Sequence, residues 1–226
     1  MTPERPGGYK IWPSGGLGEL LLLQIDPEYP EHWLIPRVVQ VLRKGGVIVM
    51  PTDTVYGVAC SISHPDAIER IYGLKKMDPK KSLSILVSDM QTIGHYTRAL
   101  PNTVFRLMKR VFPGPYTFIL EASREVPKIM LRKRKTIGIR VPDNPIALAI
   151  LEEFGEPLLS TSIRNPDDQI LNDPGEIEIR FGNRIDLVVD GGPLLPVPST
   201  VVDFTGREPE LVRRGKGDVE ELELFE

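Results

Sequence analysis

The chain has 226 residues, of which 41% are hydrophobic and 26% are charged, and its formal net charge is −3. These values are ordinary for a globular protein, so they exclude a disordered chain, a membrane-embedded protein and a nucleic-acid binder that acts through bulk positive charge. The single cysteine, Cys60, excludes an internal disulfide and a thiolate metal cluster, and we interpret it as a small buried residue.

Residues 1–19 are rich in proline and glycine and follow no hydrophobic period, so we expect an irregular N-terminal arm. No basic start followed by an apolar stretch marks a secretory signal there. The longest apolar runs, Leu20–Leu23 and Val47–Met50, are far shorter than the roughly 20 residues that cross a bilayer. We therefore expect a cytoplasmic protein with no membrane partner.

Apolar runs and helical periodicity alternate along the rest of the chain. Strands are predicted at Leu20–Ile25, Val47–Met50, Ser84–Val87, Tyr116–Leu120, Thr136–Val141, Leu158–Ser162, Ile185–Val189, Thr200–Phe204 and Glu210–Arg213. Helices are predicted at Pro36–Leu42, Pro65–Leu74, Pro101–Val111, Pro145–Phe154 and Pro174–Phe181. Some neighbouring strands are too close in sequence for a helical crossover and must pair antiparallel. The order therefore predicts an α/β fold with a twisted mixed sheet and flanking helices. We expect one domain over 20–218, followed by an acidic C-terminal tail over 219–226.

Several apolar strands carry polar side chains. In the strand Thr136–Val141, the side chains of Thr136, Gly138 and Arg140 share one face because successive residues alternate between faces. Small hydroxyl residues also stand at the ends of other strands: Thr52, Thr54, Ser160, Ser162, Ser199 and Thr200. An unpaired buried polar group costs roughly 1–3 kcal/mol, so these strands indicate either a hydrogen-bond network or a ligand.

Arg140 stands between the apolar residues Ile139 and Val141, and a buried guanidinium at this place favours a ligand. A guanidinium binds carboxylates or phosphates in a fixed fork. Together with Arg213, the polar strand ends indicate one cavity for an anionic ligand. The alternatives are structural: the hydroxyl groups would satisfy the backbone of adjacent turns, and Arg140 would form a structural salt bridge.

Common catalytic motifs are not found in the sequence. It has no G-x-G-x-x-G, no P-loop, no H-E-x-x-H and no G-x-S-x-G. The three histidines, His32, His64 and His95, fall in predicted loops or at helix ends and are interpreted as surface residues. We therefore predict no metal site built from protein ligands, and we assign no catalytic residue beyond those that position substrates.

Seven sequence blocks, in this order, resemble the YrdC-like superfamily, which includes the threonylcarbamoyl-AMP synthases and the YciO-like branch. They are PTDTVYG at 51–57, Ile71–Lys75, PGPYTFIL at 113–120, KTIGIRVPDNPIA at 135–147, LLSTS at 158–162, PSTVVD at 198–203 and LVRRG at 211–215. The resemblance covers roughly Ile35–Asp218, and the blocks at 113–120 and 133–147 look particularly similar to the YciO-like branch. It implies a twisted α/β fold around a large, concave, positively lined cavity.

The resemblance also implies an activity. The synthases convert ATP, L-threonine and bicarbonate into threonylcarbamoyl-AMP and pyrophosphate for the t6A modification of tRNA, with Mg²⁺ carried by the nucleotide. Carried over by position, the residues that would contact the amino-acid substrate are Thr54, Arg140 and Ser160. Those that would contact the nucleotide are Lys75, Thr136, Ser162, Ser199 and Arg213.

Three positions depart from the synthase pattern. Met77 stands where the synthases have an arginine, Leu86 where they commonly have a histidine, and Arg164 where they have an asparagine. The alternative function is therefore an RNA-binding protein, for tRNA or double-stranded RNA, with weak or no synthase activity. Its candidate phosphate contacts are Lys76, Lys80, Lys81, Arg132 and Arg134, unless these cations form only a solvated surface. A nucleotide-dependent hydrolase is a further alternative that no motif supports directly.

Overall fold

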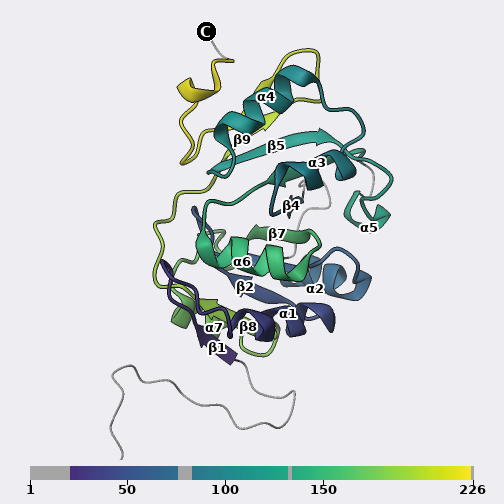
Figure 1. Ribbon diagram of the computed structural model, residues 1–226. Coiled ribbons are helices and arrows are strands. Elements are labelled where there is room, and N and C mark those ends of the chain that lie inside the picture. Colours follow the sequence, from purple (N-terminus) through teal and green to yellow (C-terminus); the bar gives the residue numbers. More distant parts are fainter. Residues whose placement is uncertain (1–20, 76–82, 132–133, 225–226) are drawn as a thin grey trace, which may run out of the picture.

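The computed structural model describes residues 21–75, 83–131 and 134–224 (Figure 1). In these ranges one twisted mixed sheet has the strand order β1-β8-β2-β3-β7-β4-β6-β5-β9-β10. Its strands are β1 (Leu21–Gln24), β2 (Ile48–Met50), β3 (Gly57–Ser61), β4 (Ser84–Leu86), β5 (Tyr116–Glu121), β6 (Thr136–Arg140), β7 (Leu158–Ser162), β8 (Leu187–Asp190), β9 (Thr200–Asp203) and β10 (Glu210–Arg213). The helices are α1 (Ile35–Arg43), α2 (Pro65–Lys75), α3 (Met90–Tyr96), α4 (Asn102–Val111), α5 (Lys128–Leu131), α6 (Pro145–Phe154) and α7 (Pro174–Phe181), with a 3-10 turn η1 (Glu220–Leu222).

Every predicted strand and helix is present, with ends shifted by at most two residues. The mixed α/β class is confirmed, because parallel pairs such as β4 with β6 alternate with antiparallel pairs such as β3 with β7. The sequence did not predict β3, α3, α5 or η1. The arm predicted for residues 1–19 lies outside the described residues. No helix in the described part of the chain is long and apolar enough to cross a bilayer.

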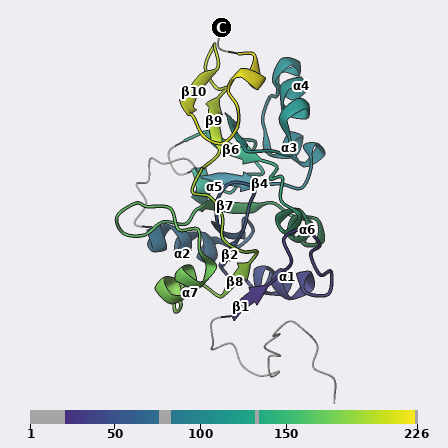
Figure 2. The ribbon, with the colours of Figure 1, turned by 90° about the vertical axis from the view of Figure 1, so that its left-hand side faces the viewer.

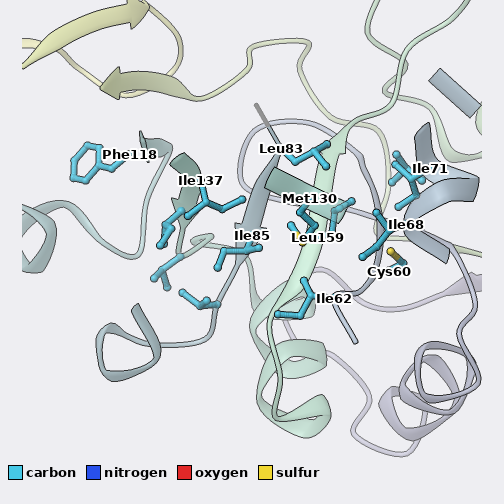
Figure 3. Packing of buried hydrophobic residues seen from close by; sticks show 14 of the residues in the cluster. Cys60, Ile62, Ile68, Ile71, Leu83, Ile85, Phe118, Met130, Ile137 and Leu159 are labelled. Atoms are coloured by element: carbon cyan, nitrogen blue, oxygen red, sulfur yellow. The ribbon is translucent and has the colours of Figure 1, made fainter. Parts of the chain in front are cut away.

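One face of the sheet is apolar over most of its width. Phe118, Ile139, Ile85, Leu159 and Cys60 lie opposite one another on β5, β6, β4, β7 and β3, and all five belong to the larger hydrophobic core. Helices α2, α4 and α7 contribute further residues to this core. Figure 3 shows the close packing of these side chains.

The opposite face is apolar only where α1 and α6 cover it. A second core joins these two helices to β1, β2 and β8 and reaches across the sheet to Leu86 and Leu158. Figure 2 shows α1 and α6 on one side of this half of the sheet and α2 and α7 on the other. Beyond Leu86 and Leu158, on the same face, the strands carry the small polar residues of the candidate site.

Cys60 is confirmed as a small buried residue. Its position predicts a low reactivity of the thiol, which chemical labelling can measure. The side chain is 0% exposed within the larger core (Figure 3), and burial raises the pKa of its thiol to about 12 although Arg70 opposes the shift. A thiol reagent needs both access and thiolate. We therefore expect no labelling of the native protein by a disulfide reagent at pH 8 over minutes, and complete labelling in guanidinium chloride. Rapid labelling of the native protein would contradict this packing.

The residues predicted as an acidic tail pack against the domain as far as they are described. Val219 and Leu222 are buried. Arg110 on α4 forms an ion pair of 2.9 Å with Glu223, and the hydroxyl of Tyr116 donates to Glu221 Oε2 at 2.5 Å. The described part of this segment therefore covers one end of the sheet beside α4 (Figure 1).

Candidate functional site

A buried ion pair lies where the segment after β2 meets the end of β6. Arg140 donates from Nη2 to Asp53 Oδ1, and both side chains are 8% exposed. Arg140 also donates from Nη1 to Thr54 Oγ1 at 2.7 Å. Burial lowers the pKa of the guanidinium, and the neighbouring Asp53 carboxylate opposes that shift. The structural salt bridge considered for Arg140 is therefore present, and it also brings Thr54 and Arg140 together.

Two atoms of this ion pair have no hydrogen-bond partner among the residues that the structure describes. They are Asp53 Oδ2, which is an acceptor, and Arg140 Nε, which is a donor, and both are buried. Such orphaned groups cost free energy unless a ligand or water satisfies them. The carboxylate clamp predicted for Arg140 stays a prediction, and Nε is the nitrogen of this guanidinium that no described residue contacts by a hydrogen bond.

The turn before β3 fixes the direction of the hydrogen bonds around Thr54. The hydroxyl of Thr52 donates to the carbonyl of Val55 at 2.7 Å and lies 3.0 Å from Thr54 Oγ1. Because a hydroxyl has one proton, Thr52 accepts from Thr54. Arginine can only donate, so Thr54 Oγ1 accepts from Arg140. The proton of Thr54 is thus committed to Thr52, and any further bond to Thr54 Oγ1 must come from a donor.

A row of small residues crosses the uncovered part of the sheet. Gly138 on β6 lies opposite Ser84 on β4, and Ser84 lies opposite Ser160 on β7. A Cβ added at Gly138 would lie 2.5 Å from Ser84 Oγ and 3.2 Å from Thr117 Cγ2. Similarly, a Cβ at Gly57 would lie 2.6 Å from Ser160 Oγ. We call Ser84, Thr117, Gly138, Arg140, Ser160 and Ser199 the polar face.

The far end of the polar face is a hydrogen-bonded corner around Ser199. Arg213 donates from Nε to the carbonyl of Ser199 at 2.9 Å and from Nη2 to Ser199 Oγ at 3.1 Å. The hydroxyl groups of Ser199 and Thr117 are 2.8 Å apart. The residues before β9 and at the end of β10 are therefore held together, which brings the predicted Ser199 and Arg213 into contact.

Lys216 connects this corner to the buried ion pair. Its backbone N–H donates to the carbonyl of Pro198 at 2.8 Å, while its Nζ donates to the carbonyl of Asp53 at 2.5 Å. The adjacent Gly215 donates its N–H to Thr200 Oγ1 at 3.0 Å. One short segment thus contacts both the strand that begins at Thr200 and the turn that holds Asp53.

Positive charge gathers around the polar face. The pKa of Arg213 is lowered, first by burial and then by the positive charges of Arg164 and Arg140. Arg164 follows β7 and donates to the carbonyl of Asp168 at 2.6 Å, with the Asp168 carboxylate 3.4 Å away. Asp53 and Asp168 are the carboxylates that pair with these three arginines within the described residues. A site with this balance suits an anionic ligand.

The structure brings together most of the predicted amino-acid and nucleotide contacts. Thr54 contacts Arg140, and Ser199 contacts Arg213, as given above. Ser160 lies on the polar face, and Ser162 and Thr136 are half-buried residues of β7 and β6. The sequence did not identify Asp53, Ser84, Thr117 or Lys216, because their roles depend on contacts with distant strands. The alternation of polar and apolar residues on β4 is too short to have revealed Ser84.

Other predicted positions are not tested. Lys75 ends α2, but its side chain lies outside the described part of the structure. The same holds for Met77 and for four of the candidate RNA contacts: Lys76, Lys80, Lys81 and Arg132. Arg134 is exposed. Leu86 is 3% exposed in the second core, so it contributes packing where a histidine would offer a polar group.

A pocket of about 560 Å³ lies between α4, the turn before β10 and residues 222–224. None of the residues that line it belongs to the polar face. The large concave cavity expected around the polar face therefore stays a prediction. Among the described residues, no group of three or more histidine, cysteine, aspartate or glutamate side chains could hold a metal ion.

Comparisons with known proteins agree with the resemblance. The family of Sua5, YciO and YrdC proteins, described as telomere recombination, matches residues 40–215. The chain is 45% identical over 197 residues to the uncharacterized protein YciO of Escherichia coli K12, covering 86% of this chain and 95% of that protein. It is 32% identical over 158 residues to a threonylcarbamoyl-AMP synthase of Coxiella burnetii, covering 70% and 84%. The crystal structure of P. abyssi Sua5 complexed with L-threonine superposes with a TM-score of 0.83 at 28% identity, covering 90% of this chain and 59% of that one.

Proposed function

Because the chain belongs to the Sua5-YciO-YrdC family, we propose that it is a threonylcarbamoyl-AMP synthase or a close variant that uses ATP, L-threonine and bicarbonate. A relative that is 32% identical is named as this synthase, and the Sua5 structure contains L-threonine. The observation that carries the proposal is the buried contact between Arg140 and Thr54 beside two orphaned polar atoms. Such a group is prepared for a small polar ligand.

The proposed chemistry requires positioning more than a nucleophilic side chain. The amino group of threonine takes up carbon dioxide as a carbamate, whose oxygen attacks the α-phosphorus of ATP and displaces pyrophosphate. Such transfer is accelerated by holding the reactants in line and by neutralising charge. Arg140 and Thr54 would hold the amino acid, and Arg213, with Ser199, would contact the phosphates. The nucleotide would bring Mg²⁺ as part of the substrate.

The position of Arg164 supports nucleotide binding at this site, although Met77 stands where the synthases have an arginine. Met77 cannot supply the forked cation that the synthases have at its position. Arg164 places another guanidinium close enough to lower the pKa of Arg213. Among the described residues, Arg164 contacts Asp168 through Nη1. The remaining donors of Arg164 would be able to contact phosphate oxygens.

The proposed function is tested with purified protein, MgATP, labelled L-threonine and bicarbonate. We expect pyrophosphate release and a labelled adenylate that both require all three substrates. Omission of bicarbonate is the matched control, because it removes the carbamate while leaving ATP and threonine to bind. Absence of pyrophosphate release under conditions in which a known synthase is active would contradict the proposed function.

Arg213→Met is expected to weaken ATP binding on the order of tenfold to a hundredfold while leaving threonine binding within about twofold, since one charge-assisted contact is worth roughly 1.5–3 kcal/mol. Arg213 contacts Ser199, which is proposed to bind the nucleotide, whereas Arg140 and Thr54 are proposed to hold the amino acid. Titration calorimetry with each ligand measures the effect. Arg207→Met is the control, because Arg207 is an exposed arginine. Equal loss of both ligands would indicate a general structural defect instead.

We propose that the product supplies the threonylcarbamoyl group for the t6A modification of tRNA. Whether this chain itself binds RNA is a separate question. The cations suggested for it lie mostly outside the described residues, and Arg134 is exposed. Binding through phosphate contacts weakens steeply with salt. A mobility-shift titration of tRNA and double-stranded RNA at two salt concentrations tests it, and no salt-sensitive complex would rule out direct binding.

A further inference from the structure

Asp53 does more than neutralise Arg140 within the buried ion pair. A structural partner for a guanidinium in a fold normally uses both carboxylate oxygens or exposes the second one to water. Here Oδ1 accepts from Arg140, whereas Oδ2 is buried and receives no hydrogen bond from residues 21–75, 83–131 or 134–224. The side chain is only 8% exposed, so one oxygen of a charged carboxylate lies inside the protein without a hydrogen bond from a described residue. That arrangement is costly unless a donor arrives with the substrate.

The groups around Oδ2 define what the donor must be. Arg140 Nε, the other orphaned atom, belongs to the same ion pair and offers a donor. Thr54 Oγ1 has its proton committed to Thr52 and can take a further bond only as an acceptor. A ligand here would therefore meet two hydrogen-bond acceptors, Asp53 Oδ2 and Thr54 Oγ1, and one donor, Arg140 Nε. A molecule that carries an ammonium group next to a carboxylate matches that set.

Charge points to the same ligand class. Asp53 is flanked by two cations, Arg140 on its carboxylate and Lys216 on its backbone carbonyl. A purely anionic ligand could accept a hydrogen bond from Arg140 Nε. Its negative charge would, however, face the negatively charged Asp53 carboxylate at Oδ2. A zwitterion places its carboxylate toward the arginine and its ammonium toward the aspartate, so both orphaned atoms are satisfied at once.

We propose that Asp53 is the residue that recognises the α-ammonium group of the amino-acid substrate, accepting its hydrogen bond at Oδ2. The inference rests on the proposed function and adds a determinant of specificity to it. Asp53 would select α-amino acids over acids that lack the amino group. It would also hold the nitrogen that becomes the carbamate beside Thr54 and Arg140.

The test compares L-threonine with 3-hydroxybutanoate of the same C3 configuration, which keeps the carboxylate and the hydroxyl but replaces the ammonium group with hydrogen. Titration calorimetry on the unaltered protein is expected to show that threonine binds at least tenfold more tightly than 3-hydroxybutanoate. Both compounds are measured on the same protein, so a folding defect of a variant cannot affect this ratio. In Asp53→Asn, threonine affinity is expected to fall on the order of tenfold to a hundredfold, and the ratio to approach one.

Three results would count against the inference, and they are distinguishable. If the unaltered protein binds both compounds equally, or if Asp53→Asn keeps the preference for threonine, Asp53 does not recognise the ammonium group, and water satisfies Oδ2. In either case the proposed function stands as long as threonine binds. If threonine does not bind to the unaltered protein at all, the proposed function fails and this inference fails with it. Thermal unfolding of Asp53→Asn confirms that the variant compared is folded.

Discussion

Arg140→Met is expected to lower the free energy of unfolding by about 3–5 kcal/mol, because removing one partner of a buried ion pair strands the other. Asp53 would keep a buried negative charge with no cation on its carboxylate, and Thr54 Oγ1 would lose its donor. Methionine keeps an unbranched stem like that of arginine, so the packing along the stem would largely be retained. Denaturant unfolding followed by circular dichroism measures the change.

The matched control is Arg180→Met, the same substitution in an exposed pair. Arg180 bonds Glu176 at 2.8 Å one turn away on α7, and the two side chains are 46% and 43% exposed. Such pairs contribute about 0.3–0.5 kcal/mol, so this variant is expected to be nearly neutral. A double variant, Arg140→Met with Asp53→Asn, should recover part of the loss, since it leaves no unpaired charge. Equal losses for Arg140→Met and the control would show that the ion pair is not buried in solution.

Gly215→Ala is expected to destabilise the protein by about 3 kcal/mol, at the upper end of the cost of overpacking. A Cβ on Gly215 would lie 2.3 Å from the carbonyl oxygen of Pro198 and 2.4 Å from the carbonyl carbon of Ser199. These are backbone atoms, so the strain cannot be relieved by a side-chain rotation. The segment that carries Arg213 and Lys216 would have to move away from Ser199, and ATP binding is expected to weaken in parallel.

Gly94→Ala provides the control for this prediction. Gly94 lies within α3, and a Cβ there would meet nothing within 4 Å. In a helix the change from glycine to alanine favours folding by up to about 1 kcal/mol. Gly94→Ala should therefore raise the free energy of unfolding, whereas Gly215→Ala should lower it. Thermal and denaturant unfolding of both variants, with calorimetry for ATP, completes the comparison. If Gly215→Ala is as stable as the unaltered protein, the close approach to Ser199 is not maintained.

Local patterns of the sequence were enough to predict most of the elements. Continuous apolar runs such as Val47–Met50 predicted buried strands, and proline at the first turn marked the starts of α1, α6 and α7. The elements that were missed have weak local signals. The strand β3 begins at the last residue of the PTDTVYG block and contains glycine and alanine, and α5 has only four residues. Pairing on both sides with β2 and β7 stabilises β3, and that pairing is not visible locally.

The sequence by itself determined that polar residues stand on apolar strands, and it determined the face on which Gly138 and Arg140 lie, because alternation along a strand is a local rule. Only the tertiary structure decided which partner each polar group found. Asp53 meets Arg140 across 87 positions and Lys216 across 163. Such contacts depend on strand order and register, which are set by long-range packing of the whole sheet rather than by any short segment. The anion site inferred from Arg140 is thus, in the structure, an ion pair with one acceptor and one donor that no described residue satisfies, and our proposal of a zwitterionic ligand rests on these two atoms.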